Sequence, residues 1–282
     1  MKKILKSILC LITMLLVIAV VVILYNYYDN NRVVVTKQNV EIENLPKSFE
    51  NFTILQISDL HEKRFGENQS KLLKLINNQD YDIIVFTGDM QLKTNQDVEP
   101  FYELLDGIED KKIMLYVTGN HGPEYNDDIK SKGCINLDKP YKIQRGDDIM
   151  WFYDFYNFYT KEFYAQPKEF KDKDIKIGIS HYPFSDNFYS KAEDKIGMYD
   201  LVISGHYHGG QIRIPFYGAI MIPTIDDGKQ FFPDQSDVSG LKTYSSYQQY
   251  ISRGLGSTSF KGLQFRLFNT PEINLITLTN QT

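Results

Sequence analysis

The chain opens with a long apolar stretch that no charged residue interrupts. Residues 7–28 carry no charge, and residues 8–24 are almost entirely Ile, Leu, Val and Met. At about 1.5 Å per residue, a helix of this length spans the roughly 30 Å hydrocarbon core of a bilayer. Tyr25, Tyr27 and Tyr28 lie where an interfacial aromatic belt would lie. The pattern predicts an uncleaved transmembrane anchor; a cleaved signal peptide and a buried helix of a soluble domain are the alternatives.

Charge gives this predicted anchor a direction. Lys2, Lys3 and Lys6 precede the apolar stretch, so the positive-inside rule places the N-terminus in the cytoplasm and the folded part outside it. We expect a single-pass membrane protein with an extracytoplasmic domain. The predicted division of the chain is an N-terminal anchor over 1–28, a linker with a first strand over 29–50, and one folded domain over 51–282.

After residue 50 the hydrophobic pattern alternates between strand and helix. Short, nearly continuous apolar runs predict strands buried on both faces at residues 52–57, 82–87, 112–118, 175–180 and 201–204. Apolar residues at helical spacing predict amphipathic helices over 69–77 and 98–108. This alternation is typical of a layered α/β domain. The tail changes character, because short strands at 211–215, 264–268 and 273–278 follow one another without helices, and we expect them to form a second, more antiparallel sheet.

An aromatic segment interrupts the pattern between the third and fourth of these strands. From Trp151 to Tyr164, nine of fourteen residues are aromatic. A packed aromatic strand or hairpin is one interpretation, and a lid or wall beside a lipid-like substrate or the membrane surface is the other.

Composition excludes several classes of protein. The chain of 282 residues has 42% hydrophobic and 24% charged residues, which excludes a largely disordered chain. Acidic residues number 36 against 31 basic ones, for a net charge of −5, and the part after the anchor carries −8 because three lysines precede it. Nucleic acid is therefore an unlikely partner. Only two cysteines occur, so a disulfide framework is excluded, and we expect Cys134 to be a small buried hydrophobe.

Each of the five buried strands is followed by a polar cluster. The clusters hold every histidine of the chain and comprise Ser58-Asp59-Leu60-His61, Thr87-Gly88-Asp89, Gly119-Asn120-His121, Ser180-His181 and Gly205-His206-Tyr207-His208. Any one of them alone would be read as an ordinary turn. Together they lie at the carboxyl ends of consecutive strands, where open α/β sheets build their sites.

The side chains in these clusters are of metal-binding types. Imidazole, carboxylate and amide oxygen bind borderline divalent ions such as Mn, Zn, Fe, Co or Ni. Asp-x-His and His-x-His spacing places two side chains on one side of an extended segment. Seven ligand candidates exceed the needs of one ion, so the sequence predicts a site for two divalent metal ions.

The order of these clusters resembles the calcineurin-like metallophosphoesterase superfamily. The segments Gly205–Pro215 and Ser252–Gly256 are similar to its membrane-associated bacterial, YkuE-like branch. The resemblance implies a layered α-β-β-α sandwich of two mixed sheets, here preceded by one transmembrane helix, with the metallophosphoesterase domain over residues 51–282.

The resemblance also implies roles for the site residues. Asp59, His61 and His208 would hold the first ion, Asn120, His181 and His206 the second, and Asp89 would bridge them. A hydroxide shared by the two ions would attack phosphorus, and His121 would be the catalytic proton donor to the leaving group.

The chain departs from the family pattern after the Gly-Asn-His triplet. The family usually has Glu or Asp there, whereas this chain has Gly122, and Glu124 is a candidate substitute for orienting His121. The Gly-Asp cluster continues Met90-Gln91, which argues against the Ser/Thr protein phosphatase branch.

We therefore expect a membrane-anchored binuclear phosphoesterase that hydrolyses phosphodiester or monoester bonds. Its partners would be the membrane, through the N-terminal helix, and a phosphorylated small-molecule or lipid-linked envelope substrate. A pyrophosphatase acting on a nucleotide-linked acylated sugar of the UDP-diacylglucosamine type is the alternative. A non-catalytic metal-binding envelope protein is a lesser one. The sequence gives no signal of oligomeric state.

Overall fold

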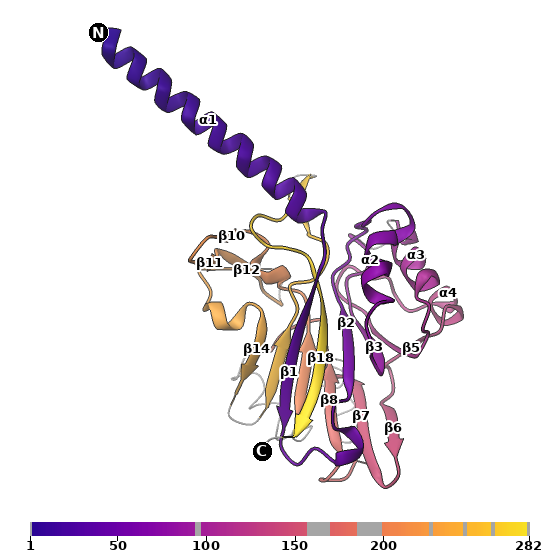
Figure 1. Ribbon diagram of the computed structural model, residues 1–282. Coiled ribbons are helices and arrows are strands. Elements are labelled where there is room, and N and C mark those ends of the chain that lie inside the picture. Colours follow the sequence, from indigo (N-terminus) through magenta and orange to yellow (C-terminus); the bar gives the residue numbers. More distant parts are fainter. Residues whose placement is uncertain are drawn as a thin grey trace.

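Two six-stranded sheets form the centre of the molecule (Figure 1). The computed structural model describes residues 2–93, 97–156, 170–184, 199–225, 228–244, 247–260 and 263–280. The first sheet has the order β1 (Val34–Ile42), β18 (Glu272–Asn280), β2 (Thr53–Ile57), β3 (Ile83–Thr87), β4 (Ile113–Val117) and β5 (Cys134–Asn136). The second has the order β14 (Gly240–Thr243), β15 (Gln248–Ile251), β9 (Leu201–Ser204), β8 (Ile175–Ile179), β7 (Asp148–Asp154) and β6 (Tyr141–Arg145).

Both sheets are mixed, as the fold prediction requires. In the first sheet β2, β3, β4 and β5 are parallel, while β18 is parallel to β1 and antiparallel to β2. In the second sheet β15, β9, β8 and β7 are parallel, with antiparallel β14 and β6 at its edges. The five central strands of the sequence analysis all occur, each within one or two residues of its predicted bounds.

The main hydrophobic core lies between the two sheets. It combines side chains of the first sheet, such as Ile54 and Val85, with side chains of the second, such as Ile177 and Ile203, all fully buried. Successive side chains of a strand point to opposite faces of the sheet. One strand therefore contributes both to this core and to a cluster on the outer face of its sheet. In β7, Phe152 belongs to this core.

Helices cover the outer face of the first sheet. These are α2 (Ser70–Ile76), α3 (Glu99–Gly107) and the short α4 (Asp127–Ser131), and their buried apolar residues join one cluster with that face. Cys134 is buried in the same cluster, as expected. An aromatic cluster that includes Trp151, Tyr153 and Phe155 covers the outer face of the second sheet. The first part of the aromatic segment is thus a packed strand, and residues 157–164 of it lie outside the described residues.

The prediction for the tail was wrong. The tail does not form its own antiparallel sheet, because β18 joins the first sheet between β1 and β2, while β14 and β15 extend the second. The remaining short strands form two-stranded pairs: β10 (Arg213–Ile214) with β11 (Gly218–Ala219), β12 (Met221–Pro223) with β13 (Lys229–Phe231), and β16 (Ser259–Phe260) with β17 (Leu263–Gln264). Single 3-10 turns occur at Lys47–Phe49, Glu67–Gln69, His208–Gly210 and Gln235–Asp237.

The N-terminal helix α1 runs from Lys2 to Asn30 and projects away from the sheets (Figure 1). It is long and apolar enough to cross a membrane, with a mean hydropathy of 3.2 over its most apolar window and none of that window buried. The first strand expected within residues 29–50 is β1, which pairs with β18 over nine residues from Val34 to Ile42.

Strand directions place the polar clusters at the end of the molecule where α1 leaves. The strand β1 starts four residues after α1 ends and runs parallel to β18. Because β2 is antiparallel to β18, the carboxyl end of β2 lies level with the start of β1. The parallel strands β3 and β4 end on the same side.

Candidate metal centre

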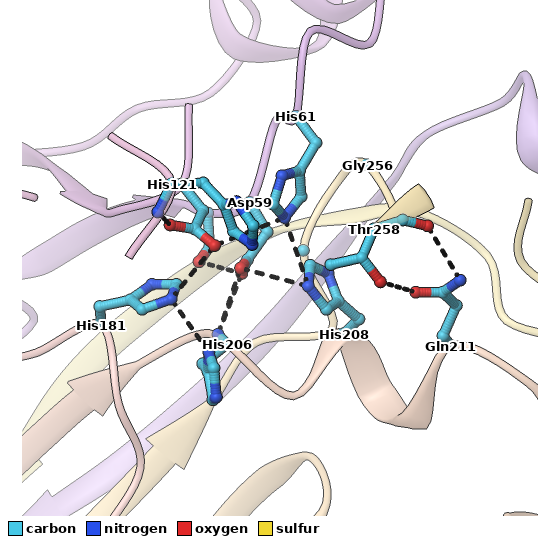
Figure 2. Close-up of polar contacts among 12 residues, drawn as sticks. Asp59, His61, His121, His181, His206, His208, Gln211, Gly256 and Thr258 are labelled. Carbon is cyan, nitrogen blue, oxygen red and sulfur yellow. Dashed lines mark hydrogen bonds and ion pairs between the residues drawn. The ribbon is translucent and has the colours of Figure 1, made fainter. Parts of the chain in front are cut away.

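The predicted ligands come together where the carboxyl ends of the two sheets meet (Figure 2). The first sheet supplies Asp59 and His61 after β2, Asp89 after β3, and Asn120 and His121 after β4. The second sheet supplies His181 after β8, and His206 and His208 after β9. Both aspartates and four of the five histidines are buried, Asn120 is exposed, and His121 is half-buried.

One side of the cluster is formed by Asp59, His61 and His208. The Nε2 atoms of the two histidines lie 3.3 Å apart, and Nε2 of His208 lies 3.8 Å from Oδ1 of Asp59. One ligand atom from each of the three residues lies within 4.8 Å of the others. Three buried polar atoms thus point into one small volume.

The other side is formed around Nε2 of His181. This atom lies 2.9 Å from Oδ1 of Asn120, 3.1 Å from Nδ1 of His206 and 3.3 Å from Oδ2 of Asp89. The same Oδ2 atom of Asp89 lies 3.6 Å from Nε2 of His61. Asp89 therefore lies between the two halves of the cluster, with one oxygen near a histidine of each.

Backbone carbonyls fix the orientation of two rings. Nδ1 of His61 lies 2.9 Å from the carbonyl oxygen of Gln91, and Nδ1 of His181 lies 2.9 Å from that of Thr87. A carbonyl can only accept, so each Nδ1 donates, and the neutral ring keeps its lone pair on Nε2. In this neutral form the lone pairs face carboxylate, amide and imidazole acceptors, so the space between them suits a cation or a proton.

Burial shapes the charge of this site. It lowers the pKa of His61 to about 4 and that of His206 to about 3, which keeps both rings neutral at pH 7. Burial raises the pKa of Asp59 to about 7. His181 is the exception: burial would lower its pKa, but the facing Asp89 carboxylate raises it to about 9. A proton on His181 thus competes with a cation for this side of the cluster.

Five of the seven ligand candidates have an unusual backbone. Their φ angles lie in the left-handed region, which few residues other than glycine adopt, although Asn, Asp and His do so more often than the rest, at Asp59 (53°), His61 (46°), Asp89 (55°), His206 (68°) and His208 (51°). Such residues cost about 1–3 kcal/mol each and concentrate at functional sites. The fold therefore bends the chain at unfavourable positions to turn these side chains inward.

Glycines let the strand ends approach the carboxylates. A Cβ atom on Gly205 would overlap the hydroxyl of Ser58 and the carboxylate of Asp59, and one on Gly119 would overlap the carboxylate of Asp89. The side chain at either position would displace a ligand candidate, so both positions require glycine.

His121 lies at the open side of the cluster, which is the side where the neighbouring Asn120 is exposed. Its backbone N–H donates to Oδ1 of Asp89 at 2.8 Å, and its ring meets that of His61 edge-on at 5.3 Å between centroids. Within the described part of the chain, Glu124 makes no hydrogen bond to this ring and is exposed. Contacts with Asp89 and His61 therefore position His121, and the suggestion that Glu124 replaces the usual acid finds no contact to support it.

Two residues that the sequence analysis missed hold His208 in place. The backbone carbonyl of His208 accepts a hydrogen bond from Nδ2 of Asn269 at 2.7 Å and from Nη2 of Arg266 at 3.2 Å. Arg266 is fully buried and also donates to the carbonyls of Arg253, Gly256 and Asn269. Its position in the tail of the sequence gave no signal, because its partners are 3 to 58 residues away in the sequence.

This centre belongs to a known class of enzyme. A family model described as calcineurin-like phosphoesterase matches residues 52–210, which include every ligand candidate. The chain belongs to this family, and it is a phosphoric ester hydrolase of the metallophosphoesterase type.

The relatives point to the YkuE-like branch. The chain is 27% identical over 267 residues to the uncharacterized metallophosphoesterase YkuE of Bacillus subtilis, with 87% of this chain and 85% of YkuE covered. It is 26% identical to the phosphodiesterase YaeI of Escherichia coli, with 80% and 82% covered. Among solved structures, Vps29 of Chaetomium thermophilum aligns over 72% of this chain and 71% of its own, with 12% identity and a TM-score of 0.35.

Proposed function

We propose that the chain is a membrane-anchored phosphodiesterase with a binuclear metal centre, acting on a lipid-linked or other envelope phosphodiester. The observation that carries this proposal is the position of the ligand cluster at the end of the sandwich where α1 leaves. An anchor at that end would keep the reacting groups close to lipid headgroups. The relative named a phosphodiesterase favours a diester over a monoester.

The geometry supports two ion positions that share Asp89. Asp59, His61 and His208 would hold one ion, and Asn120, His181 and His206 the other, with Asp89 between them. When bound, divalent ions would supply the Lewis acidity that activates water and offsets charge on the phosphoryl oxygens. Mn, Zn, Fe, Co and Ni all suit this donor set of imidazole, carboxylate and amide.

The residues of the chain supply positioning and a proton. The hydrogen bonds of His61 and His181 to backbone carbonyls hold their lone pairs toward the ion positions. His121, half-buried at the open side, would donate a proton to the departing oxygen.

The test is activity profiling of the full chain in vesicles, loaded with each candidate metal in turn. Bis-(p-nitrophenyl) phosphate serves as the soluble diester, a phospholipid in the same vesicles as the lipid diester, and a UDP-linked acylated sugar as the pyrophosphate. We expect metal-dependent hydrolysis of both diesters. Preference for the UDP-linked substrate would replace this proposal by the pyrophosphatase alternative. Two bound ions with no hydrolysis of any phosphoester would favour a non-catalytic metal-binding protein.

A further inference from the structure

A group of exposed hydrophobic side chains follows the ligand candidates His206 and His208 in the sequence, at residues 214–217 and 232. Phe216 is fully exposed, Phe232 is 69% exposed, and Ile214 and Tyr217 are about half-exposed. Tyr217 and Phe232 are neighbours, with ring centroids 6.2 Å apart. We call Ile214, Phe216, Tyr217 and Phe232 the interfacial patch. Exposed aromatic groups of this kind mark surfaces that bind something apolar.

The interfacial patch is continuous with the end of α1. Phe268 lines a cavity of about 360 Å³ together with the patch residues Ile214, Phe216 and Tyr217. The ring of Phe268 also lies 5.9 Å from that of Tyr25 in α1. In Figure 1, β10 and β11, which carry the patch turn, lie at the same end of the molecule as the base of α1. Tyr25, which is expected at the membrane interface, thus contacts Phe268, and Phe268 borders the patch.

Two residues of the interfacial patch, both with exposed rings, have a strained backbone. Phe216 has a φ of 67° and Phe232 a φ of 52°, in the left-handed region. Bulky residues are rare there, whereas glycine or asparagine would adopt this conformation at little cost. The bridging Phe268 has a φ of 50°. Phenylalanine at such positions indicates a use for the exposed ring.

Polar contacts join the end of α1 to the segment that carries Phe268. Asp29, buried at the end of the helix, accepts hydrogen bonds from Nε of Arg32 at 2.9 Å and from Oγ1 of Thr270 at 2.8 Å. Nδ2 of Asn30 donates to the carbonyl of Arg266 at 2.8 Å, and the N–H of Arg266 donates to Oδ1 of Asn30 at 3.0 Å. The helix end is thus joined to the segment that carries Phe268.

We propose that the interfacial patch inserts into the headgroup region of the bilayer as a second membrane contact beside α1. This inference rests on the proposed anchoring, because α1 would bring this end of the molecule to the bilayer. Aromatic side chains prefer the membrane interface, and Arg213, which lines the same cavity, suits lipid phosphates.

A second contact would set the height and tilt of the metal centre. The patch turn begins six residues after His208, and Arg213 donates to the carbonyl of Gly209 at 2.8 Å. Arg266, bonded to Asn30 of α1, also holds the carbonyl of His208. Insertion of the patch would therefore fix the ligand cluster close to the headgroups, where α1 alone would leave the domain free to tilt.

Depth-dependent fluorescence quenching tests this inference on the full chain in mixed zwitterionic and anionic phospholipid vesicles. A polarity-sensitive thiol probe is placed on natural Cys10 within α1, or on Phe216→Cys or Phe232→Cys in a Cys10→Ser background. Cys134 is buried, and burial raises the pKa of its thiol to about 12, so it takes no label. Glu43→Cys, exposed just after β1 at the opposite end of the sheet, is the matched control.

We expect the probes at 216 and 232 to shift to shorter wavelength on reconstitution. A lipid spin-labelled near the headgroup should quench them most. A lipid labelled in the upper acyl chain should quench Cys10 most, because Cys10 lies about 11 Å from the middle of the apolar stretch. Neither lipid should quench the probe at 43. Quenching at Cys10 with the probes at 216 and 232 behaving like that at 43 would overturn the second contact and leave the anchor intact. Absence of quenching at Cys10 would overturn the anchoring and this inference with it.

Discussion

Individual residues show how much chemistry a sequence reveals and where it stops. The spacing of Asp59 and His61, and of His206 and His208, indicated a metal site before any fold was known. The same spacing gave no sign that all four residues have left-handed backbone angles. That conformation depends on contacts made after folding, such as the hydrogen bond from the N–H of Asp59 to the carbonyl of Gly88. Residue types were therefore predictable, and backbone strain was not.

Asp89 is the residue whose loss should affect the whole centre. We expect Asp89→Asn to lower activity at least about 100-fold and to reduce metal content, because one of its oxygens lies near a histidine of each half. Metal analysis and diester hydrolysis of the purified chain measure both effects. Asp80→Asn makes the same chemical change at an exposed carboxylate and should change neither. Turnover at the wild-type rate in Asp89→Asn would refute the bridging role.

His121 should affect the reaction without affecting the metals. We expect His121→Ala to lower kcat about 100-fold or more while metal content stays at the wild-type level, because its ring lies at the open side. Loss of metal in this variant would instead make His121 a ligand.

Glu272 should link stability to pH. Burial opposes its ionisation, but the hydrogen bonds and charge of Arg253 outweigh burial and lower the pKa of Glu272 below its usual value. A lowered folded-state pKa adds stability that is present above the unfolded-state pKa, about 4.3, and is lost as pH falls through the folded-state pKa.

We therefore expect Glu272→Gln to lower the free energy of unfolding by about 3 kcal/mol at pH 7, with a smaller difference from wild type below pH of about 4. Thermal or denaturant unfolding in detergent at both pH values measures the difference. Glu41→Gln, exposed on β1, is the control. An equal loss at both pH values would show that ionisation of Glu272 does not contribute.

At the scale of elements, the buried parallel strands were predictable and their partners were not. Continuous apolar runs such as residues 83–87 report burial on both faces, which is a local property of the sequence. The placement of β18 between β1 and β2 depends on pairing across more than two hundred residues. No local pattern carries that information, which is why the tail was assigned to a sheet of its own. The division of the chain at residue 50 stays a prediction.

The strand β1 should be essential to the domain although it precedes residue 50. A variant lacking residues 2–28 should fold, because it keeps Asp29 and β1. A variant lacking residues 2–42 should aggregate, because it removes buried Val40 and Ile42 and exposes the pairing edge of β18. Circular dichroism and gel filtration distinguish these outcomes. A folded, monomeric protein without residues 2–42 would contradict the structural role of β1.

At the scale of the whole molecule, the anchor and the centre act as one unit in our proposal. We expect removal of residues 2–28 to leave hydrolysis of a soluble diester unchanged, since no ligand candidate lies in α1. Hydrolysis of a phospholipid diester in vesicles should fall at least about tenfold, because the anchor provides a high local concentration of substrate. Parallel assays of the two substrates measure the ratio. An equal loss for both would indicate damage to the centre itself.

The antiparallel pairing of β2 with β18, which turns the ligand cluster toward the anchor, has a kinetic consequence. A tethered site that faces the bilayer meets its substrate by lateral diffusion in two dimensions. The relevant substrate concentration is then a surface density, the mole fraction of the reactive lipid among all lipids. Dilution of the suspension would leave the rate per enzyme unchanged, whereas dilution of the reactive lipid with inert lipid would lower it. In the proposed function, this strand direction would make the enzyme respond to the composition of the membrane and not to the contents of the surrounding solution.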